Sequence, residues 1–196
     1  MATHTIITIS CAKDRGDKQD AIRNTWQRQA WACGYMHQFL LGAGNEKAGM
    51  DEWIVDADDS YAGISAKLRA AYKMAQGWNG YVFVSCIDTY IVPVRLRASE
   101  YWKHDYVGLR SAGEQHASGG NGYWLSPDAL AALALLPPGN GYADLLDHND
   151  LAAGGISLHD DQRYGASITK HLGKGTGVYE AKWMYDAHHK FLEQPL

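Results

Sequence analysis

The chain contains few cysteines and no long apolar run. Three cysteines occur in 196 residues, at positions 11, 33 and 86. They are odd in number and widely spaced, so they indicate neither a disulfide framework nor a zinc site. No apolar stretch is long enough to cross a bilayer, and the first residues lack the basic segment and apolar core of a signal peptide. We therefore expect a cytoplasmic protein without a membrane span.

An excess of positive charge is also lacking. Lysine and arginine number 18 against 22 acidic residues, and the net charge of −4 offers no broad basic surface for nucleic acid, although it leaves room for a local patch. Phenylalanine is scarce, with 3 residues against 7 tryptophans and 12 tyrosines. Tryptophan and tyrosine often line carbohydrate- or base-binding surfaces, and they also fill ordinary cores. With 46% hydrophobic and 20% charged residues, the composition predicts one globular domain spanning residues 1–196.

Apolar and β-branched runs alternate with segments of helical period along the chain. Strands are predicted at residues 4–10, 38–41, 53–56, 106–109 and 122–125, in the run that ends at Asp88, and as short segments at 156–158 and 167–170. Helices are predicted at residues 18–31, with Asp17 as N-cap, and at 63–76, 126–136, 142–153 and 179–191. This alternation indicates an α/β sandwich with a mainly parallel sheet.

The most informative segment is the apolar run at residues 80–93, which carries a single carboxylate, Asp88. In open α/β sheets, ligands bind just beyond the carboxyl ends of the strands. An acid at that position suits a divalent cation, which in turn suits a diphosphate. The alternative is a buried strand whose terminal aspartate begins a turn.

Six motifs follow one another in a fixed order along most of the chain. They are residues 21–26 (AIRNTW), 39–42 (FLLG), 59–61 (DSY) followed by Lys67, 88–93 (DTYIVP), 118–126 (SGGNGYWLS) and 143–156 (beginning ADLLDH). In this order they resemble the β-1,3-galactosyltransferase and fringe-like glycosyltransferases. The resemblance implies a GT-A fold, a three-layer α/β/α sandwich. It also implies transfer of a sugar from a nucleotide-diphosphate sugar to an acceptor hydroxyl, with inversion.

The resemblance also assigns roles to individual residues. Asp144 matches the catalytic base, with Asp147 and Asp150 nearby as alternatives. Asp88 and His171 match positions that face a Mn²⁺ or Mg²⁺ ion and the diphosphate. Donor contacts are expected from Arg15, Arg23, Asp56, Asp59, Lys67, Ser118, Gly119, Gly120, Lys170 and Lys174.

Several of these donor contacts have a structural alternative. Arg23 suits a diphosphate, and it suits at least as well an ion pair that locks the helix to an acid of a loop. The acidic loop at residues 56–59 suits ribose or base hydroxyls, or simply solvent. The glycines at residues 119–120 permit close approach of a sugar to the backbone, or form a tight turn.

The departures from the family pattern define the alternative functions. Cys86 and Ile87 stand where the family has acids, Ala143 replaces the first acid of the last motif, and His148 replaces a glycine. A non-catalytic module that binds a nucleotide sugar or a glycan is therefore the second hypothesis. A nucleotide-binding protein of another class is a third, but residues 11–16 are not a glycine-rich phosphate loop. For the enzyme, the sequence leaves open a glycan, a lipid-linked sugar, a protein or a hydroxylated base of phage DNA as acceptor, in a bacterial or viral setting.

Overall fold

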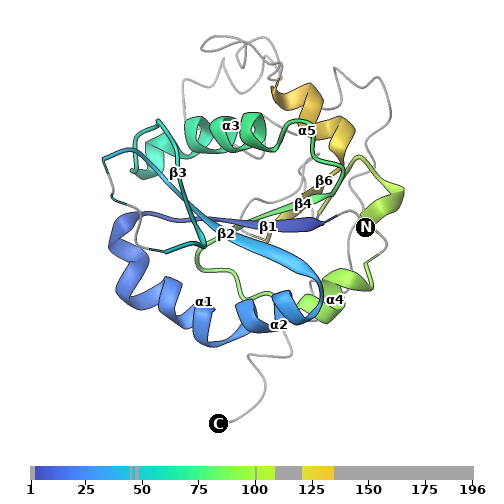
Figure 1. Cartoon of the computed structure of the whole chain (residues 1–196), viewed down its shortest axis with the longest axis horizontal. Helices are drawn as coiled ribbons and strands as arrows, with labels where there is room; N and C mark the ends of the chain where they lie inside the picture. The colour runs from blue at the N-terminus through green and yellow to red at the C-terminus, as the bar shows by residue number, and fades with distance from the viewer. Residues whose placement is uncertain (1–2, 45, 47–48, 100, 109–120, 135–196) are drawn as a thin grey trace, which may run out of the picture.

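The computed structural model describes residues 3–44, 46, 49–99, 101–108 and 121–134 (Figure 1). Within this part of the chain, a six-stranded sheet has the order β3-β2-β1-β4-β6-β5. The strands are β1 (His4–Ile9), β2 (Tyr35–Leu41), β3 (Glu52–Ile54), β4 (Val82–Cys86), β5 (Tyr106–Gly108) and β6 (Tyr123–Leu125). The first four run parallel, while β6 is antiparallel to β4 and β5 is antiparallel to β6. The prediction of an α/β fold with a mainly parallel sheet is confirmed.

Helices cover both faces of the sheet. The α-helices are α1 (Asp20–Asn24), α2 (Trp26–Ala32), α3 (Ile64–Ala75), α4 (Pro93–Arg97) and α5 (Pro127–Ala134). Shorter helical turns are the 3-10 helices Ala12–Asp14, Tyr61–Gly63 and Tyr101–Lys103 and the π-helix Arg15–Gln19. Figure 1 shows α3 and α5 on one face and α1, α2 and α4 on the other.

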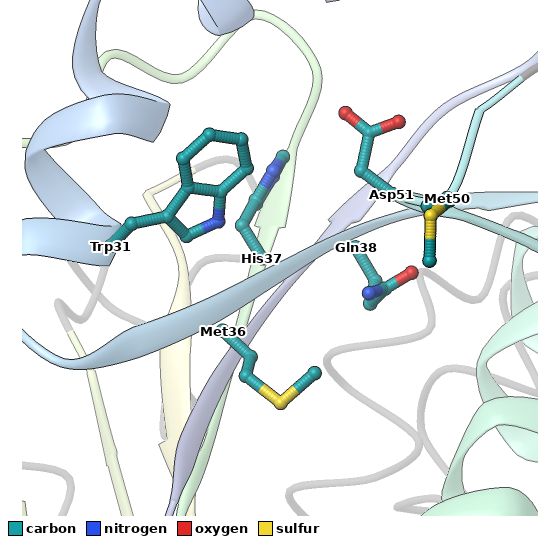
Figure 2. Close-up of a pocket in the computed structure, with 6 residues that line it drawn as sticks. All are labelled: Trp31, Met36, His37, Gln38, Met50 and Asp51. Carbon is teal, nitrogen blue, oxygen red and sulfur yellow. The ribbon is translucent and has the colours of Figure 1, made fainter.

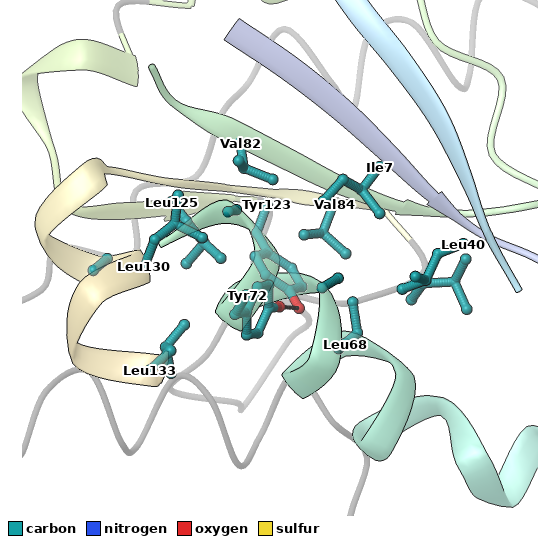
Figure 3. Close-up of a cluster of buried hydrophobic side chains, with 14 of the residues drawn as sticks. Ile7, Leu40, Leu68, Tyr72, Val82, Val84, Tyr123, Leu125, Leu130 and Leu133 are labelled. Carbon is teal, nitrogen blue, oxygen red and sulfur yellow. Dashed lines mark hydrogen bonds between the residues drawn. The ribbon is translucent and has the colours of Figure 1, made fainter. Parts of the chain in front are cut away.

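Each face of the sheet has its own apolar core. Toward α3 and α5, β-strand residues such as Ile7 and Val84 pack with Leu68, Tyr72 and Leu130 (Figure 3). In this core the hydroxyl groups of Tyr72 and Tyr123 are 2.9 Å apart and share a hydrogen bond. Toward α1, α2 and α4, the core contains Ile6, Ile22, Trp26, Phe39, Phe83, Leu96 and Trp124. Both faces of the parallel strands are therefore buried, which explains their nearly continuous apolar sequences.

The strand order reverses between β1 and β4. The chain passes from β1 through α1 and α2 to β2 on one side, and from β3 through α3 to β4 on the other. The first connection leads from β1 outward to β2 over one face, and the other returns from β3 over the opposite face to β4, so the carboxyl ends of β1 and β4 lie between the two connections. This is a topological switch point, the place where open α/β sheets bind their ligands.

The predicted helix at residues 18–31 is wrong in its start and its continuity. Helical turns begin at Ala12, Asp17 lies inside the π-helix and does not cap a helix, and the backbone breaks at Thr25. The hydroxyl of Thr25 donates to the carbonyl of Ala21 at 2.6 Å, so a side chain competes with the helical ladder at that point.

Other boundaries also move. Strand β2 begins at Tyr35 and not at residue 38. It includes the polar His37, whose side chain is buried. Helix α4 was not predicted, although Pro93 occupies a position in the first turn where proline is favoured. The predicted elements at residues 142–153, 156–158, 167–170 and 179–191 lie outside the described residues.

Gly122 allows β6 to lie against β4. Its φ is +84°, and a Cβ atom there would lie 2.4 Å from Cζ of Phe83 and 2.8 Å from the carbonyl oxygen of Val84. We expect Gly122→Ala to lower the free energy of unfolding by about 2–3 kcal/mol, because it adds both backbone strain and overlap. Urea denaturation measures this change.

Gly77 provides the control for this substitution. Its φ is +85°, but nothing lies within 4 Å of a Cβ built there, so Gly77→Ala adds the backbone strain alone. We expect it to cost about 1 kcal/mol. Equal losses at the two positions would contradict the close-contact argument.

Candidate functional site

A cavity of about 250 Å³ lies at the switch point. Ser10 and Cys11 line it from the end of β1, and Cys86, Ile87 and Asp88 line it from the end of β4. The ladder between these strands pairs Ile9 with Cys86, which sets the two ends side by side. Residues 59–61 and α3 contribute Asp59, Tyr61, Ile64 and Lys67 on the same cavity. The cavity thus lies where a parallel sheet of this order is expected to bind a ligand.

Asp88 lies two positions beyond the last residue of β4 and is exposed. The sequence predicts an acid just past the carboxyl end of this strand, and the structure places it on the cavity. The neighbouring thiol of Cys86 and the apolar Ile87 side chain share that wall. Asp88 therefore presents one solvated carboxylate to the cavity.

Lys67 and Asp59 line the cavity, but both are already hydrogen-bonded to other groups of the protein. The Lys67 ammonium, only 2% exposed, donates to the carbonyl oxygen of Ser10 at 2.8 Å and to the carbonyl and Oδ1 of Asp59 at 3.3 and 3.4 Å. An ammonium has three protons, and each has an acceptor here. The Asp59 carboxylate also accepts the backbone N–H groups of Ala12 and Gly42, at 2.9 and 2.6 Å.

These contacts join the ends of β1 and β2 to the start of α3. Gly42 is required for them, because a Cβ at that position would lie 2.5 Å from the backbone of Asp59. The structure thus gives Lys67 and Asp59 a structural role beneath the cavity. Their predicted contact with a donor remains a prediction.

The structure does not bring Arg15 and Arg23 to the cavity. Nε and Nη2 of Arg15 each lie 2.9 Å from the carboxylate of Glu52, which is fully buried. Arg23 donates to both carboxylate oxygens of Asp51, at 2.9 and 3.1 Å, and to Asp20 at 3.0 Å. The structural alternative for Arg23, a helix locked to an acid of a loop, is therefore what the structure shows. Arg15 is also paired, but with Glu52 of strand β3.

These ion pairs shift the pKa values of their members. The hydrogen bonds that Arg23 donates to Asp51 raise the pKa of Arg23 despite its partial burial. Burial acts against the charged form of Asp51, but hydrogen bonds from Arg23 and Gln27 outweigh it and lower its pKa. Both groups therefore stay charged and paired at neutral pH.

Asp56 is exposed in the loop after β3 and does not line this cavity. The nearby Asp58 is also exposed, and hydrogen bonds from the hydroxyl and N–H of Ser60 lower its pKa. The remaining predicted site residues lie outside the described residues: Asp144, Asp147, Asp150, Ser118, Gly119, Gly120, Lys170, Lys174 and His171.

Two features of the cavity were missed in the sequence. Cys11 lies beside Asp14, to whose carboxylate its thiol donates at 2.9 Å, and burial together with Asp14 raises the pKa of that thiol. Lys13 and Lys18 line the same cavity from the turns after β1. The signal available in the sequence was their position directly after a predicted buried strand, where side chains of the first loop face the ligand site.

The described residues do not form a Mn²⁺ or Mg²⁺ site by themselves. Among them, no group of three His, Cys, Asp or Glu side chains is arranged to hold a metal ion. The Asp59 carboxylate already accepts hydrogen bonds from Lys67 and from two backbone N–H groups. The Asp14 carboxylate accepts a hydrogen bond from the Cys11 thiol and pairs with Lys18 at 3.7 Å. Thiols such as Cys86 are soft ligands, whereas these two cations prefer oxygen.

Comparison with known proteins assigns no family. No protein-family model matches the chain, and no curated protein is significantly similar to it. Within the described residues, every helix is too short or too polar to cross a membrane.

Proposed function

We propose that the protein is a glycosyltransferase that uses a nucleotide-diphosphate sugar. The observation that carries this proposal is the cavity at the switch point between β1 and β4, with Asp88 on its wall. The ordered motifs of the sequence support it, since the same strand end corresponds to the diphosphate-facing element of the family they resemble. The proposed acceptor is a hydroxyl group of a glycan, a protein or a modified base.

In this proposal the reaction is an inverting, in-line displacement. The acceptor oxygen forms a bond to the anomeric carbon as the bond from that carbon to the diphosphate breaks, and Asp144 takes the acceptor proton. Asp88 would supply one oxygen to a divalent cation, and that cation would hold the diphosphate end of the donor. A need for Mn²⁺ or Mg²⁺ is part of the proposal.

The test is turnover of a panel of nucleotide sugars, read as release of nucleoside diphosphate with and without Mn²⁺. We expect Asp88→Asn to lower turnover of the accepted donor by about a hundredfold, the size typical of losing one electrostatic group in an active site. Asp144→Ala is expected to abolish turnover while donor binding persists. Asp17→Asn is the control, because Asp17 is exposed on the π-helix and does not line the cavity.

A non-catalytic nucleotide-sugar-binding module is the second candidate. Cys86 and Ile87 favour it, because they leave Asp88 without acidic neighbours in its own segment. A donor that raises the melting temperature but is never turned over, with Asp144→Ala behaving like wild type, would establish this function in place of the enzyme. If no nucleotide sugar binds, both proposals fail.

A further inference from the structure

Charges of both signs line the cavity at the switch point, and most of them are paired within the protein. The charged lining residues are Lys13, Asp14, Lys18, Asp59, Lys67 and Asp88. The ammonium of Lys18 lies 3.7 Å from Asp14, and that of Lys67 lies 3.4 Å from Asp59. These two ion pairs leave one cation and one anion of the lining, Lys13 and Asp88.

Lys13 and Asp88 are both exposed, and they follow neighbouring strands. Lys13 lies in the turn after β1 and Asp88 just past β4, and the ladder pairs the ends of these two strands. In the part of the chain that the structure describes, neither side chain has a hydrogen bond or an ion pair. Burial and Asp14 raise the pKa of the Cys11 thiol, whereas the charge of Lys13 acts to lower it. The Lys13 ammonium is therefore close enough to act on a group of the cavity wall.

A second cavity, of about 270 Å³, offers no such cation. Its lining consists of Trp31, Met36, His37, Gln38, Met50 and Asp51, without a lysine or an arginine (Figure 2). Both oxygens of the Asp51 carboxylate already accept hydrogen bonds from Arg23, and one also accepts from Gln27. Of these two cavities, only the one at the switch point thus presents an unpaired ammonium to an anionic ligand.

We propose that Lys13 binds the diphosphate group of the donor directly, as the protein's own cation beside a divalent cation held by Asp88. This inference rests on the proposed function. An ammonium donates charge-assisted hydrogen bonds to phosphate oxygens. A diphosphate that carries a metal ion suits both unpaired groups, because its free oxygens accept from Lys13 while the ion takes an oxygen of Asp88. It follows that a diphosphate still binds, more weakly, when the metal ion is absent.

Protection of thiols from alkylation reports this binding without requiring turnover. Cys11 and Cys86 line the cavity, Cys33 does not, and all three are partly buried. The full chain is treated with iodoacetamide in EDTA, with and without inorganic pyrophosphate, and the modified peptides are quantified by mass spectrometry. We expect pyrophosphate to slow alkylation of Cys11 and Cys86 in a saturable way and to leave Cys33 unchanged. Mg²⁺ in place of EDTA should lower the pyrophosphate concentration that gives half-maximal protection.

Variants at Lys13 locate the contact. Lys13→Met is expected to raise the half-maximal pyrophosphate concentration by roughly tenfold, as for the loss of one charge-assisted hydrogen bond. Lys13→Arg keeps the charge and should stay within about threefold of wild type. Lys73→Met is the matched control, because Lys73 is exposed on α3 and does not line the cavity. Half-maximal concentrations are compared, and not basal rates, because removing the Lys13 charge by itself raises the pKa of the Cys11 thiol.

The outcomes separate this inference from the proposed function. Equal protection of wild type and Lys13→Met, equal slowing at Cys33, or no protection with or without Mg²⁺ overturns the role of Lys13, while turnover of a nucleotide sugar would leave the transferase proposal standing. Protection that depends on Lys13, without turnover of any nucleotide sugar, supports the diphosphate site and contradicts the transferase. Protection by L-alanine but not by pyrophosphate would assign Lys13 and Asp88 to a zwitterionic ligand and overturn the proposal.

Discussion

Replacing Lys67 with methionine is expected to lower the free energy of unfolding by roughly 3 kcal/mol, the lower end of the usual cost of removing one member of a buried charged pair, because the partner Asp59 side chain is still 21% exposed. The substitution keeps the length and apolar stem of the side chain but removes all three N–H donors. The carbonyl oxygen of Ser10 and the carboxylate of Asp59 then lose the cation that joins them. Urea denaturation followed by circular dichroism measures the loss.

Lys73→Met is the matched control, because Lys73 is exposed in the last turn of the same helix, α3. We expect its unfolding free energy to stay within about 0.5 kcal/mol of wild type, as for most surface substitutions. The opposite pattern is also informative. If Lys67→Met unfolded like wild type but no longer bound a nucleotide sugar, Lys67 would belong to the donor site and not to the framework beneath it.

The order of strands and helices was predictable because the parallel strands have a strong local signal. Residues 4–10 and the run before Asp88 are apolar on both faces, as expected for strands covered by helices on each side. The position of Asp88 could also be read from the local sequence. The chain leaves the buried strand where the apolar run ends, so an acid just after the run lies at the edge of the sheet. The cavity at the ends of β1 and β4 therefore agrees with the expectation from the sequence.

The partners of the charged side chains were not predictable in the same way. Arg23 and Asp51 are 28 positions apart, and Arg15 and Glu52 are 37 apart. Such pairs form only because β3 docks on β2 and presents its first residues to the turns after β1. A sequence pattern shows that an arginine follows a strand, but not whether an acid from another loop already neutralises it.

The same limit applies to polar side chains inside the sheet. The second strand is predicted from residue 38, which leaves His37 outside it. In the structure its Nε2 lies 3.0 Å from the hydroxyl of Thr8, and its Nδ1 lies 2.8 Å from Nε2 of Gln27. The hydroxyls of Thr8 and Ser85 lie 3.1 Å apart, so the hydrogen-bond network extends to β4. Polar partners on neighbouring strands and on α2 thus make the buried histidine compatible with the strand.

This network is expected to make the protein sensitive to acid. The amide nitrogen of Gln27 donates to Nδ1 of His37, so that nitrogen must carry no proton. Burial lowers the pKa of His37 to about 3 in the folded protein, whereas an unfolded histidine titrates near about 6.5. Between these values only the unfolded chain takes up the proton. The free energy of unfolding should therefore fall as the pH decreases from 6.5 toward 3, by up to about 1.4 kcal/mol per pH unit from this group.

His37→Gln isolates this contribution, because glutamine has an amide donor and acceptor but does not titrate. The variant is expected to be less stable at neutral pH. Between about pH 6.5 and 3, however, its unfolding free energy should depend less steeply on pH, because nearly one proton fewer is taken up on unfolding. Urea denaturation at a series of pH values gives the slope. His4→Gln is the comparison: burial also lowers the pKa of His4, whose Nδ1 accepts the N–H of Tyr81, but this side chain is only half-buried. Its substitution should change the slope less. An unchanged slope in His37→Gln would mean that carboxylates, and not the buried imidazole, control the loss of stability in acid.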